Sequence, residues 1–202
     1  MTVDPRFARS ATALETAVLQ LAAERPIEEL SVSEIARAAH VSRATFYNHA
    51  ESPEELLGRV LAAGLDRVRA DFLRGFVGGD LEAEWRKSEM ALLTHVEEHQ
   101  DVYRMALAPT KANRGTAMQA MLARHIESSL LDFAEASAPH RFQDPGERLH
   151  LEMEVAFTSH GLVGALRAWL LSPEPRDRDA ASDFLIEATP RYWFDLANAP
   201  TA

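Results

Sequence analysis

Apolar residues recur along most of the chain at the three- and four-residue spacing of helices, and no segment alternates convincingly as a strand would. Asp4-Pro5 is a typical helix start, an N-cap residue followed by a first-position proline, and it predicts a helix to about Glu24. Pro53 begins a second long helix that reaches about Arg74. Further helices are predicted over 81–99, 101–108, 112–137, 145–171 and 178–196, with prolines between them. The pattern therefore predicts an all-α fold.

Residues 30–39 have the pattern of a short helix. Four apolar positions share one face of that helix: Val32, Ile35, Ala36 and Ala39. Ser33 is its predicted N-cap, and Glu34 in the first turn suits the helix dipole. The segment that starts at His40 interrupts the helix, so a turn is expected there.

A second short helix follows the turn, with Ser42 as its predicted N-cap. Phe46 and Ala50 lie four residues apart and face inward, so the side chains between them face outward. The outward-facing residues are Arg43, Ala44, Tyr47 and Asn48. Two short helices joined through such a turn form a helix-turn-helix, whose second helix fits the major groove of DNA. The segment therefore predicts DNA binding.

The same segment resembles the N-terminal domain of the TetR/AcrR family of bacterial transcriptional regulators. The residues that match the family pattern are Ser31, Val32, Ile35, Ala36, Ala39, Val41, Ser42, Arg43, Thr45, Phe46, Tyr47, His49, Glu55, Leu56 and Leu57. The S-R-x-T-F-Y-x-H part is similar to the branch that includes regulators of dihydroxyacetone-kinase operons. The resemblance implies an N-terminal three-helix helix-turn-helix DNA-binding domain, followed by a C-terminal helical ligand-binding and dimerisation domain.

Three positions depart from the family pattern. His40 stands where glycine is usual, so a residue with a side chain has to adopt a left-handed backbone conformation. Ala50 replaces a large core aromatic, and Pro53 replaces a lysine that meets a DNA phosphate. Because proline suits the first position of a helix, the fold is expected to be retained while that phosphate charge is lost.

The expected organisation has three parts. Residues 1–52 form the helix-turn-helix DNA-binding domain, 53–75 a connecting helix, and 76–202 the helical ligand-binding and dimerisation domain. The turn at 76–80, which contains two glycines, is the best boundary between the head and the body.

Charge limits how DNA can be bound. The chain carries 21 Lys and Arg against 31 Asp and Glu, a formal net charge of −10, and residues 1–63 alone carry six arginines against nine acidic residues. This balance excludes a broad basic coat, so DNA binding has to rely on a local patch and base contacts. The absence of cysteine excludes disulfides and thiolate chemistry. With no membrane-length apolar run and no signal-peptide core, a cytoplasmic location is expected.

The candidate DNA-binding residues belong to the two short helices and their flanks. They are Arg37, Ser42, Arg43, Ala44, Thr45, Tyr47, Asn48 and His49. Arg43 is the best candidate for bidentate contact with guanine, whereas Tyr47 and His49 are expected at phosphates. His49 also fits the alternative of a solvated position on the rim of the helix.

The two helices 145–171 and 178–196 carry the most apolar surface, and Pro190 is expected to kink or end the second. A helix that is apolar on most sides needs partners on most sides. Gly161 and Gly164 allow another helix to approach closely. Pairing with the same helices of a second copy predicts a homodimer, as the resemblance also implies, and a buried core helix within one monomer is the alternative.

Large, adaptable side chains at helical spacing predict a site for an apolar small-molecule effector within 81–171. The candidate ligand-binding residues are Trp85, Met121, His125 and Phe157. Methionine and aromatic residues also fill ordinary cores, so each of the four has that alternative. No Arg/Lys cluster or glycine-rich loop is present to bind a phosphate group.

A catalytic alternative depends on residues 95–99, which match the inverted zinc-protease pattern H-x-x-E-H. His95 and His99 share a face if one helix contains both, and could then bind a metal in a hydrolase. A solvated helix end explains the same residues, so neither an enzyme nor a cofactor is expected. A helical adaptor that binds protein through its head is a further alternative, suggested by the acidic balance and the missing lysine.

Taken together, the sequence predicts a homodimeric regulator that binds a palindromic operator and is released by a small molecule. Two recognition helices about 34–36 Å apart would meet successive major grooves. A ligand that binds better to a differently spaced state of the dimer lowers DNA affinity by population shift. Repression is expected over activation because the family leans that way.

Overall fold

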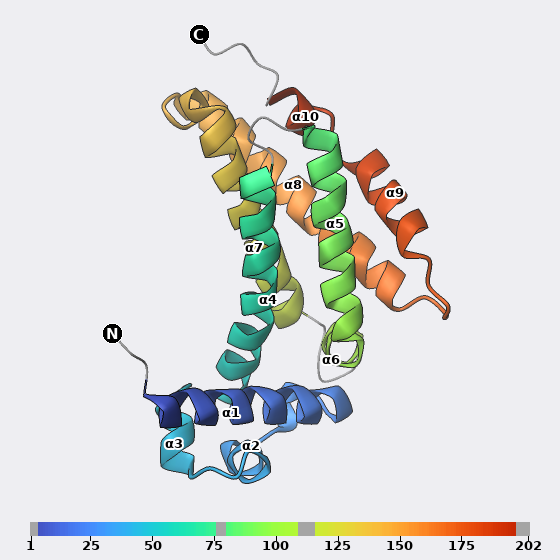
Figure 1. The fold of residues 1–202 in the computed structure, drawn as a ribbon. Helices are drawn as coiled ribbons and strands as arrows, with labels where there is room; N and C mark the ends of the chain where they lie inside the picture. The colour runs from blue at the N-terminus through green and yellow to red at the C-terminus, as the bar shows by residue number, and fades with distance from the viewer. Residues whose placement is uncertain (1–3, 76–79, 109–115, 197–202) are drawn as a thin grey trace. The chain divides into compact units, whose positions relative to one another are not determined.

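The computed structural model describes residues 4–75, 80–108 and 116–196. Every regular element in these ranges is helical, so the predicted all-α class is confirmed (Figure 1). The elements are α1 (Pro5–Glu24), η1 (Ile27–Glu29), α2 (Val32–Ala38), α3 (Arg43–Tyr47), α4 (Pro53–Gly75), α5 (Leu81–Glu98), α6 (Gln100–Leu107), α7 (Thr116–Ser137), η2 (Pro139–Phe142), α8 (Pro145–Leu170), α9 (Arg178–Ala188) and α10 (Tyr192–Leu196). None of the helices in the described part is both long and apolar enough to cross a membrane.

Proline and capping residues begin the long helices where the sequence predicts. In α1 the Asp4 carboxylate accepts a hydrogen bond from the backbone N–H of Arg6 at 2.8 Å, and Pro5 occupies the first helical position. Helix α4 likewise begins at Pro53, one of the three departures from the family pattern. Proline in place of the family's usual lysine therefore leaves the start of α4 intact, as expected.

The C-terminal segment differs from a single predicted helix. Helix α9 ends at Ala188 and α10 begins at Tyr192, with Pro190 between them. This break is the one predicted at Pro190, since a proline cannot continue the backbone hydrogen-bond ladder. The first residues of the predicted helix 112–137 and residues 76–79 of the predicted turn lie outside the described residues.

The chain divides into two compact units. The first comprises Met1–Gly64 and His99–Met118, and the second comprises Leu65–Glu98 and Gln119–Ala202. Helices α4 and α7 each contribute residues to both units. The units do not follow chain order, because residues 99–118 group with the first. The three-part division along the chain stays a prediction.

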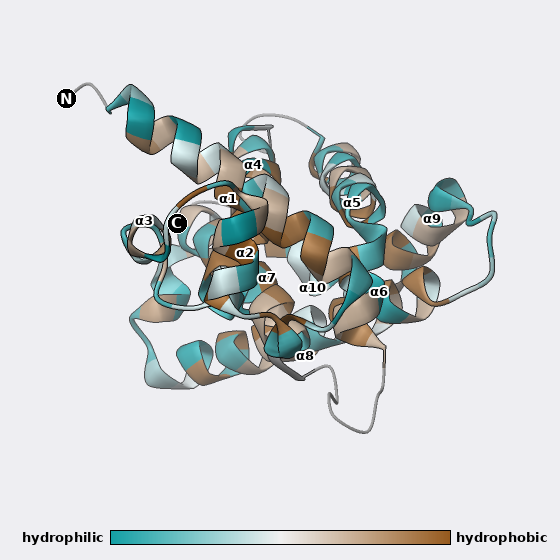
Figure 2. Cartoon of the chain, turned by 90° about the horizontal axis from the view of Figure 1, so that it is seen from below, coloured by the Kyte–Doolittle hydropathy of each residue, from teal (hydrophilic) through white to brown (hydrophobic). Residues whose placement is uncertain are grey.

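In the first unit, α1 packs against α2 and α6, and α2 packs against α3. Leu14 and Val18 of α1, Ile35 of α2 and Phe46 of α3 are fully enclosed at 0% exposure. Hydrophobic bands alternate with hydrophilic ones along α1 and α2 (Figure 2). Burial of these apolar faces is the main force that holds the short helices to α1.

The second unit is built around a cluster of aromatic rings. Trp85 of α5 lies 5.5 Å from Phe72 of α4, 5.8 Å from Phe133 of α7 and 6.2 Å from Trp193 of α10, measured between ring centroids. Beside this cluster, Leu93, Leu166 and Leu185 join α5, α8 and α9. Aromatic rings bury large apolar areas, so this cluster dominates the core of the unit.

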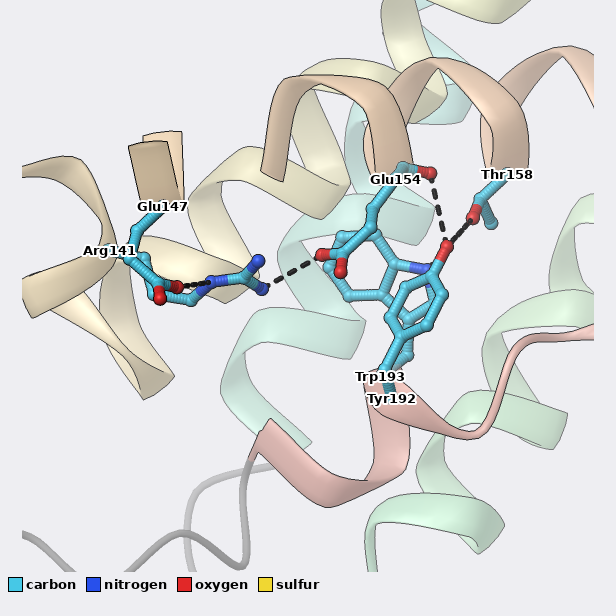
Figure 3. A network of polar contacts seen from close by, with 6 residues as sticks. All are labelled: Arg141, Glu147, Glu154, Thr158, Tyr192 and Trp193. Atoms are coloured by element: carbon cyan, nitrogen blue, oxygen red, sulfur yellow. Dashed lines mark hydrogen bonds and ion pairs between the residues drawn. The ribbon is translucent and has the colours of Figure 1, made fainter. Parts of the chain in front are cut away.

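Polar contacts attach α10 to α8 (Figure 3). The indole N–H of Trp193 donates to the Thr158 hydroxyl at 2.9 Å. The Tyr192 hydroxyl lies 3.2 Å from the same Thr158 oxygen and donates to the backbone carbonyl of Glu154 at 3.4 Å. The five-residue helix α10 is thus held by two side chains whose polar groups find hydrogen-bonding partners on α8.

An ion-pair network continues from this contact to η2. Arg141, only 8% exposed, donates to the Glu154 carboxylate at 2.8 Å and lies 3.4 Å from the carboxylate of Glu147 (Figure 3). Two carboxylates around one mostly buried guanidinium balance a charge that would otherwise be costly to enclose.

The N-terminus of α2 is capped at a different serine from the predicted one. The Ser31 hydroxyl accepts from the backbone N–H of Glu34 at 3.2 Å, and the Glu34 carboxylate accepts from the backbone N–H of Ser31 at 2.9 Å. Ser33, the predicted cap, lies exposed within the first turn, so that prediction was wrong. The hydrogen bond from the Ser31 backbone, followed by that from Arg25, lowers the pKa of Glu34 to about 2. Reciprocal capping of this kind satisfies two backbone N–H groups at once.

We expect Ser31→Ala to lower the free energy of unfolding by about 1 kcal/mol, because the cap of α2 is lost. The matched control is Ser33→Ala, which should be neutral or slightly stabilising, because alanine favours a helical position. Urea unfolding of the full chain, followed by circular dichroism, measures both. Equal losses in the two variants would contradict the assignment of the cap to Ser31.

Candidate nucleic-acid interface and ligand cavity

Helices α2 and α3 form the predicted helix-turn-helix. The turn between them closes through the backbone, where the N–H of Val41 donates to the carbonyl of Ala36 at 2.9 Å. The Ser42 hydroxyl then accepts from the backbone N–H of Thr45 at 3.0 Å and caps α3, as predicted. A five-residue helix is therefore started by a side chain and positioned by a tight turn.

The residue in the turn is strained in the way its sequence position predicts. His40 has a φ of 53°, the only positive φ of a non-glycine residue in the described chain. Glycine reaches this left-handed region without a Cβ clash, whereas histidine does so at a cost. The turn that sets the angle between α2 and α3 thus depends on a residue poorly suited to it.

One side of α3 is buried and the other is open. Phe46 is fully enclosed, whereas Tyr47 is 53% exposed. Five further candidate DNA-binding residues are also exposed: Arg37, Ser42, Arg43, Ala44 and Asn48. Thr45 is half-buried, and its hydroxyl lies 2.8 Å from that of Ser42. The exposed set is compatible with a surface that reads DNA, since α2, the turn and α3 together offer cationic and hydrogen-bonding groups.

His49 differs from the other candidates because it is buried, at 7% exposure. Its Nε2 lies 2.8 Å from the Ser10 hydroxyl, and its ring lies 4.0 Å from that of Phe7. The guanidinium of Arg59 donates to the His49 carbonyl. Burial and, secondarily, the Arg59 charge lower the pKa of His49. Neither an exposed phosphate contact nor a solvated rim position describes this residue, which instead packs the end of α3 against α1.

A family comparison identifies this segment. Residues 14–60 match the family described as bacterial regulatory proteins, tetR family. This segment therefore resembles the DNA-binding domain of that family and is called the TetR-type domain below. It runs from the middle of α1 through α2 and α3 to the first residues of α4. Comparison with curated protein sequences gave no match.

Solved structures share the fold over nearly the whole chain. A TetR-family regulator from Streptomyces coelicolor has 18% identity and a TM-score of 0.61, covering 98% of this chain and 89% of that one. The dihydroxyacetone kinase operon activator DhaS has 15% identity and a TM-score of 0.57, covering 94% of this chain and 96% of that one. NalD of Pseudomonas aeruginosa is the secondary repressor of the MexAB-OprM multidrug efflux pump. It has 19% identity and a TM-score of 0.55, covering 94% of this chain and 96% of that one.

At these identities the solved structures show the fold alone. Their agreement over the full chain, joined to the TetR-type domain at residues 14–60, supports a DNA-binding transcriptional regulator. The narrower similarity to regulators of dihydroxyacetone-kinase operons stays a prediction.

Outside the TetR-type domain, the second unit contains a cavity of about 80 Å³ between α4, α5 and α7. Trp85 and His125, two of the predicted ligand-binding residues, line it. Met121 does not line it, and Phe157 is 72% exposed on α8 beside a separate groove. The four residues therefore do not form one site, because the outward face of α8 carries Phe157 away from the cavity. Burial lowers the pKa of His125, although the nearby Asp66 carboxylate acts in the opposite direction.

The metal-binding alternative loses the geometry on which it depends. Helix α5 ends at Glu98, and His99 is the N-cap residue of α6 with a φ of −116°. His95 is buried within α5 at 7% exposure. Because the two histidines do not lie on one continuous helix, the i,i+4 face is absent. Within the described ranges, no group of three or more His, Asp or Glu side chains is arranged to hold a metal ion.

We expect His40→Gly to raise the free energy of unfolding by roughly 1 kcal/mol, because glycine removes the Cβ clash at positive φ. The control is Ala38→Gly, at an exposed position within α2. This variant should lower the free energy of unfolding by about 1 kcal/mol, because glycine is less favourable than alanine inside a helix. Urea unfolding of both full-length variants tests the pair. If both glycines destabilise the chain, the turn is not strained as described.

Proposed function

We propose that the chain is a homodimeric, ligand-released repressor that binds a palindromic operator. The observation that carries the proposal is the exposed face of α3, with Arg43, Tyr47 and Asn48 open to solvent in a TetR-type domain. An exposed recognition helix above a buried Phe46 can enter the major groove without disturbing the core.

Base reading is assigned chiefly to Arg43, because its planar guanidinium matches the two acceptors of guanine. Asn48 and Thr45 supply further hydrogen bonds. A hydroxyl both donates and accepts, so Thr45 can bond to DNA while it keeps its contact with Ser42. Tyr47 and Arg37 are assigned to phosphates. With a net charge of −10, the protein has little nonspecific attraction for DNA, so these few contacts have to supply specificity.

Dimerisation is assigned to α8 and α9. Four large apolar side chains stand open on these helices: Leu149, Met153, Phe157 and Phe184 are each more than half exposed, at 56%, 62%, 72% and 57%. Between the helices lies a largely apolar groove of about 650 Å³. A contiguous exposed patch of this kind is typical of an interaction surface. A second copy of the same two helices can cover it symmetrically.

Two glycines in α8 favour close approach by that second copy. A Cβ placed on Gly161 or Gly164 meets no atom within 4 Å, so the space above both residues is open in the single chain. Small residues at an interface allow helix backbones to pack at short distance. The monomeric alternative, in which α8 is simply a core helix, does not account for its exposed face.

Ligand release requires a small molecule that binds one state of the dimer better than the other. Helix α4 gives residues 53–64 to the first unit and 65–75 to the second, where it lines the cavity. A ligand in the cavity therefore touches the same helix that supports the DNA-binding unit. DhaS is described as an activator and NalD as a repressor, so the fold serves either outcome. We assign repression to this chain.

We expect Arg43→Ala to reduce the preference for selected over scrambled DNA by the equivalent of about 1–3 kcal/mol, because the guanine contact is lost. Duplexes are first selected from a random library with the wild-type protein, and binding to both kinds is then measured by fluorescence anisotropy. Arg148→Ala removes one exposed positive charge from α8 and is the control. A preference unchanged in Arg43→Ala would remove Arg43 from the reading surface. If the library yields no enriched sequence, the proposed function fails.

Sedimentation at micromolar concentration should give twice the chain mass of 22.4 kDa. We expect Gly164→Arg to shift the protein toward monomer, because the new side chain fits the single chain but fills the interface. Gly58→Arg is the matched control, since that helical glycine of α4 also has no atom within 4 Å of a built Cβ. A monomeric wild-type protein would defeat this assignment.

A further inference from the structure

Glu89 is a buried carboxyl group without a hydrogen-bonding partner. It lies on α5, is 5% exposed and lines the cavity between α4, α5 and α7. Neither of its two oxygens accepts a hydrogen bond in the described structure. Buried polar groups are nearly always paired, so an orphaned carboxyl beside an open space needs an explanation.

Two arginines close to this cavity are paired with carboxylates other than Glu89: Arg69 lines the cavity, and the Arg86 charge acts on Glu89. Arg69 of α4 lies 3.7 Å from Asp66 and 3.7 Å from Asp132. Arg86, one turn before Glu89 on α5, pairs with Asp183 of α9. These ion pairs leave the Glu89 carboxyl as an acidic group with no cation of its own.

His125 of α7 completes the set of ionisable groups around the cavity. Its Nδ1 lies 3.6 Å from Asp66, and burial lowers its pKa. It is therefore mostly neutral near pH 7 and does not neutralise Glu89. Burial also raises the pKa of Glu89 to about 8, while the Trp85 indole and the Arg86 charge act in the opposite direction. These surroundings favour the protonated carboxyl, and a cation bound beside it would favour the carboxylate.

The walls of the cavity suit the apolar part of such a cation. Trp85 and Phe72 stand edge to face, with ring centroids 5.5 Å apart, and both line the space. Aromatic rings present large apolar surfaces against which an alkyl or aryl group can pack. A volume of about 80 Å³ limits the occupant to a small molecule.

We propose that this cavity binds a small alkyl- or arylalkylammonium ion, with its N–H groups donating to the Glu89 carboxylate and its apolar part against Trp85 and Phe72. This inference rests on the proposed function, because it names the chemical class of the effector that the ligand-released regulator takes. No bond is made or broken, and the only proton that moves leaves Glu89 for solvent when the ammonium ion binds.

The test compares each amine with the alcohol of the same shape. Isothermal titration of the full-length protein at pH 7.5 uses butylamine and benzylamine, then butanol and benzyl alcohol. We expect the amines to bind at least tenfold more tightly than the alcohols, because only the ammonium ion pairs with the carboxylate. Equal affinity within a pair, or no binding of either amine, overturns the proposal.

Two variants locate the effect. Glu89→Gln keeps the shape but removes the negative charge, so we expect amine affinity to fall at least tenfold and alcohol affinity to stay within twofold of wild type. Glu82→Gln removes one exposed charge from the same helix and should bind both ligands as wild type does. Amine affinity retained in Glu89→Gln overturns the proposal.

The pH dependence of the wild-type protein gives a measurement that needs no variant. Between pH 6 and pH 8 the amines stay protonated while Glu89 approaches its raised pKa from below. As the pH rises, a smaller fraction of the protein molecules has to release a proton from Glu89 when the amine binds. Amine affinity should therefore rise roughly tenfold or more from pH 6 to pH 8. Arginine side chains do not titrate in this range, so Arg69 and Arg86 add no pH dependence. Burial lowers the pKa of His125, which reduces the charge that it can carry at the acidic end. A flat profile for the amines overturns the proposal even if Glu89→Gln does not fold.

Failure of this inference is distinguishable from failure of the proposed function. A protein that binds its selected operator but no amine leaves the regulator in place and removes the ammonium ligand. Amines that bind through Glu89 while the operator stays occupied support the cavity assignment and remove ligand release.

Discussion

Everything that the DNA-binding unit does depends on packing around α3, because five residues cannot hold a helix in water by themselves. Phe46 supplies the apolar anchor, Ser42 the cap and His40 the turn. His49 fixes the other end of the helix to α1. The direction in which Arg43 points is therefore a property of the whole unit rather than of the recognition helix.

The two units present surfaces of different chemistry. The exposed face of α3 is polar and carries Arg43, whereas the exposed face of α8 is apolar. An apolar face on α3 would lower solubility and offer no hydrogen-bonding groups to DNA bases. A polar face on α8 would remove the free energy that burial of its apolar side chains provides. On the proposed function, the described residues therefore place DNA recognition and subunit association on different helices, α3 and α8. In the second unit, the cavity at Glu89 adds a third chemistry, a carboxyl group within aromatic walls.

Local signals in the sequence predicted local structure well. Asp4-Pro5, Ser42 and Pro190 act through their own backbone or that of the next few residues, so their effects could be deduced without tertiary information. The predicted cap at Ser33 was wrong because Glu34 does more than suit the helix dipole: its carboxylate bonds back to the backbone of Ser31, which makes Ser31 the cap. Helix caps are therefore predictable only when both partners are considered together.

Contacts between distant elements were not predictable in this way. Helical spacing assigns His49 and Phe157 to faces of their helices, but it does not reveal what covers each face. Helix α1 covers His49, whereas the described residues leave Phe157 exposed. Glu89 carried a signal, since it stands four residues after Trp85 among apolar positions that continue to Leu93 and Val96. The sequence does not reveal that it lacks a partner, because Arg69 and Arg86 pair with Asp132 and Asp183, far along the chain.

The position of Trp193 has a consequence for how the protein is made. This fully buried residue completes the aromatic core around Trp85 and Phe133, yet it lies near the C-terminal end of the described chain. Helices α1 to α3 can associate early in synthesis, because their contacts are close in sequence. The aromatic core cannot close until α10 has been synthesised, so the second unit exposes a large apolar surface during translation. Slow synthesis or premature termination before Trp193 would therefore expose this unit to chaperones and proteases while the helix-turn-helix is already formed.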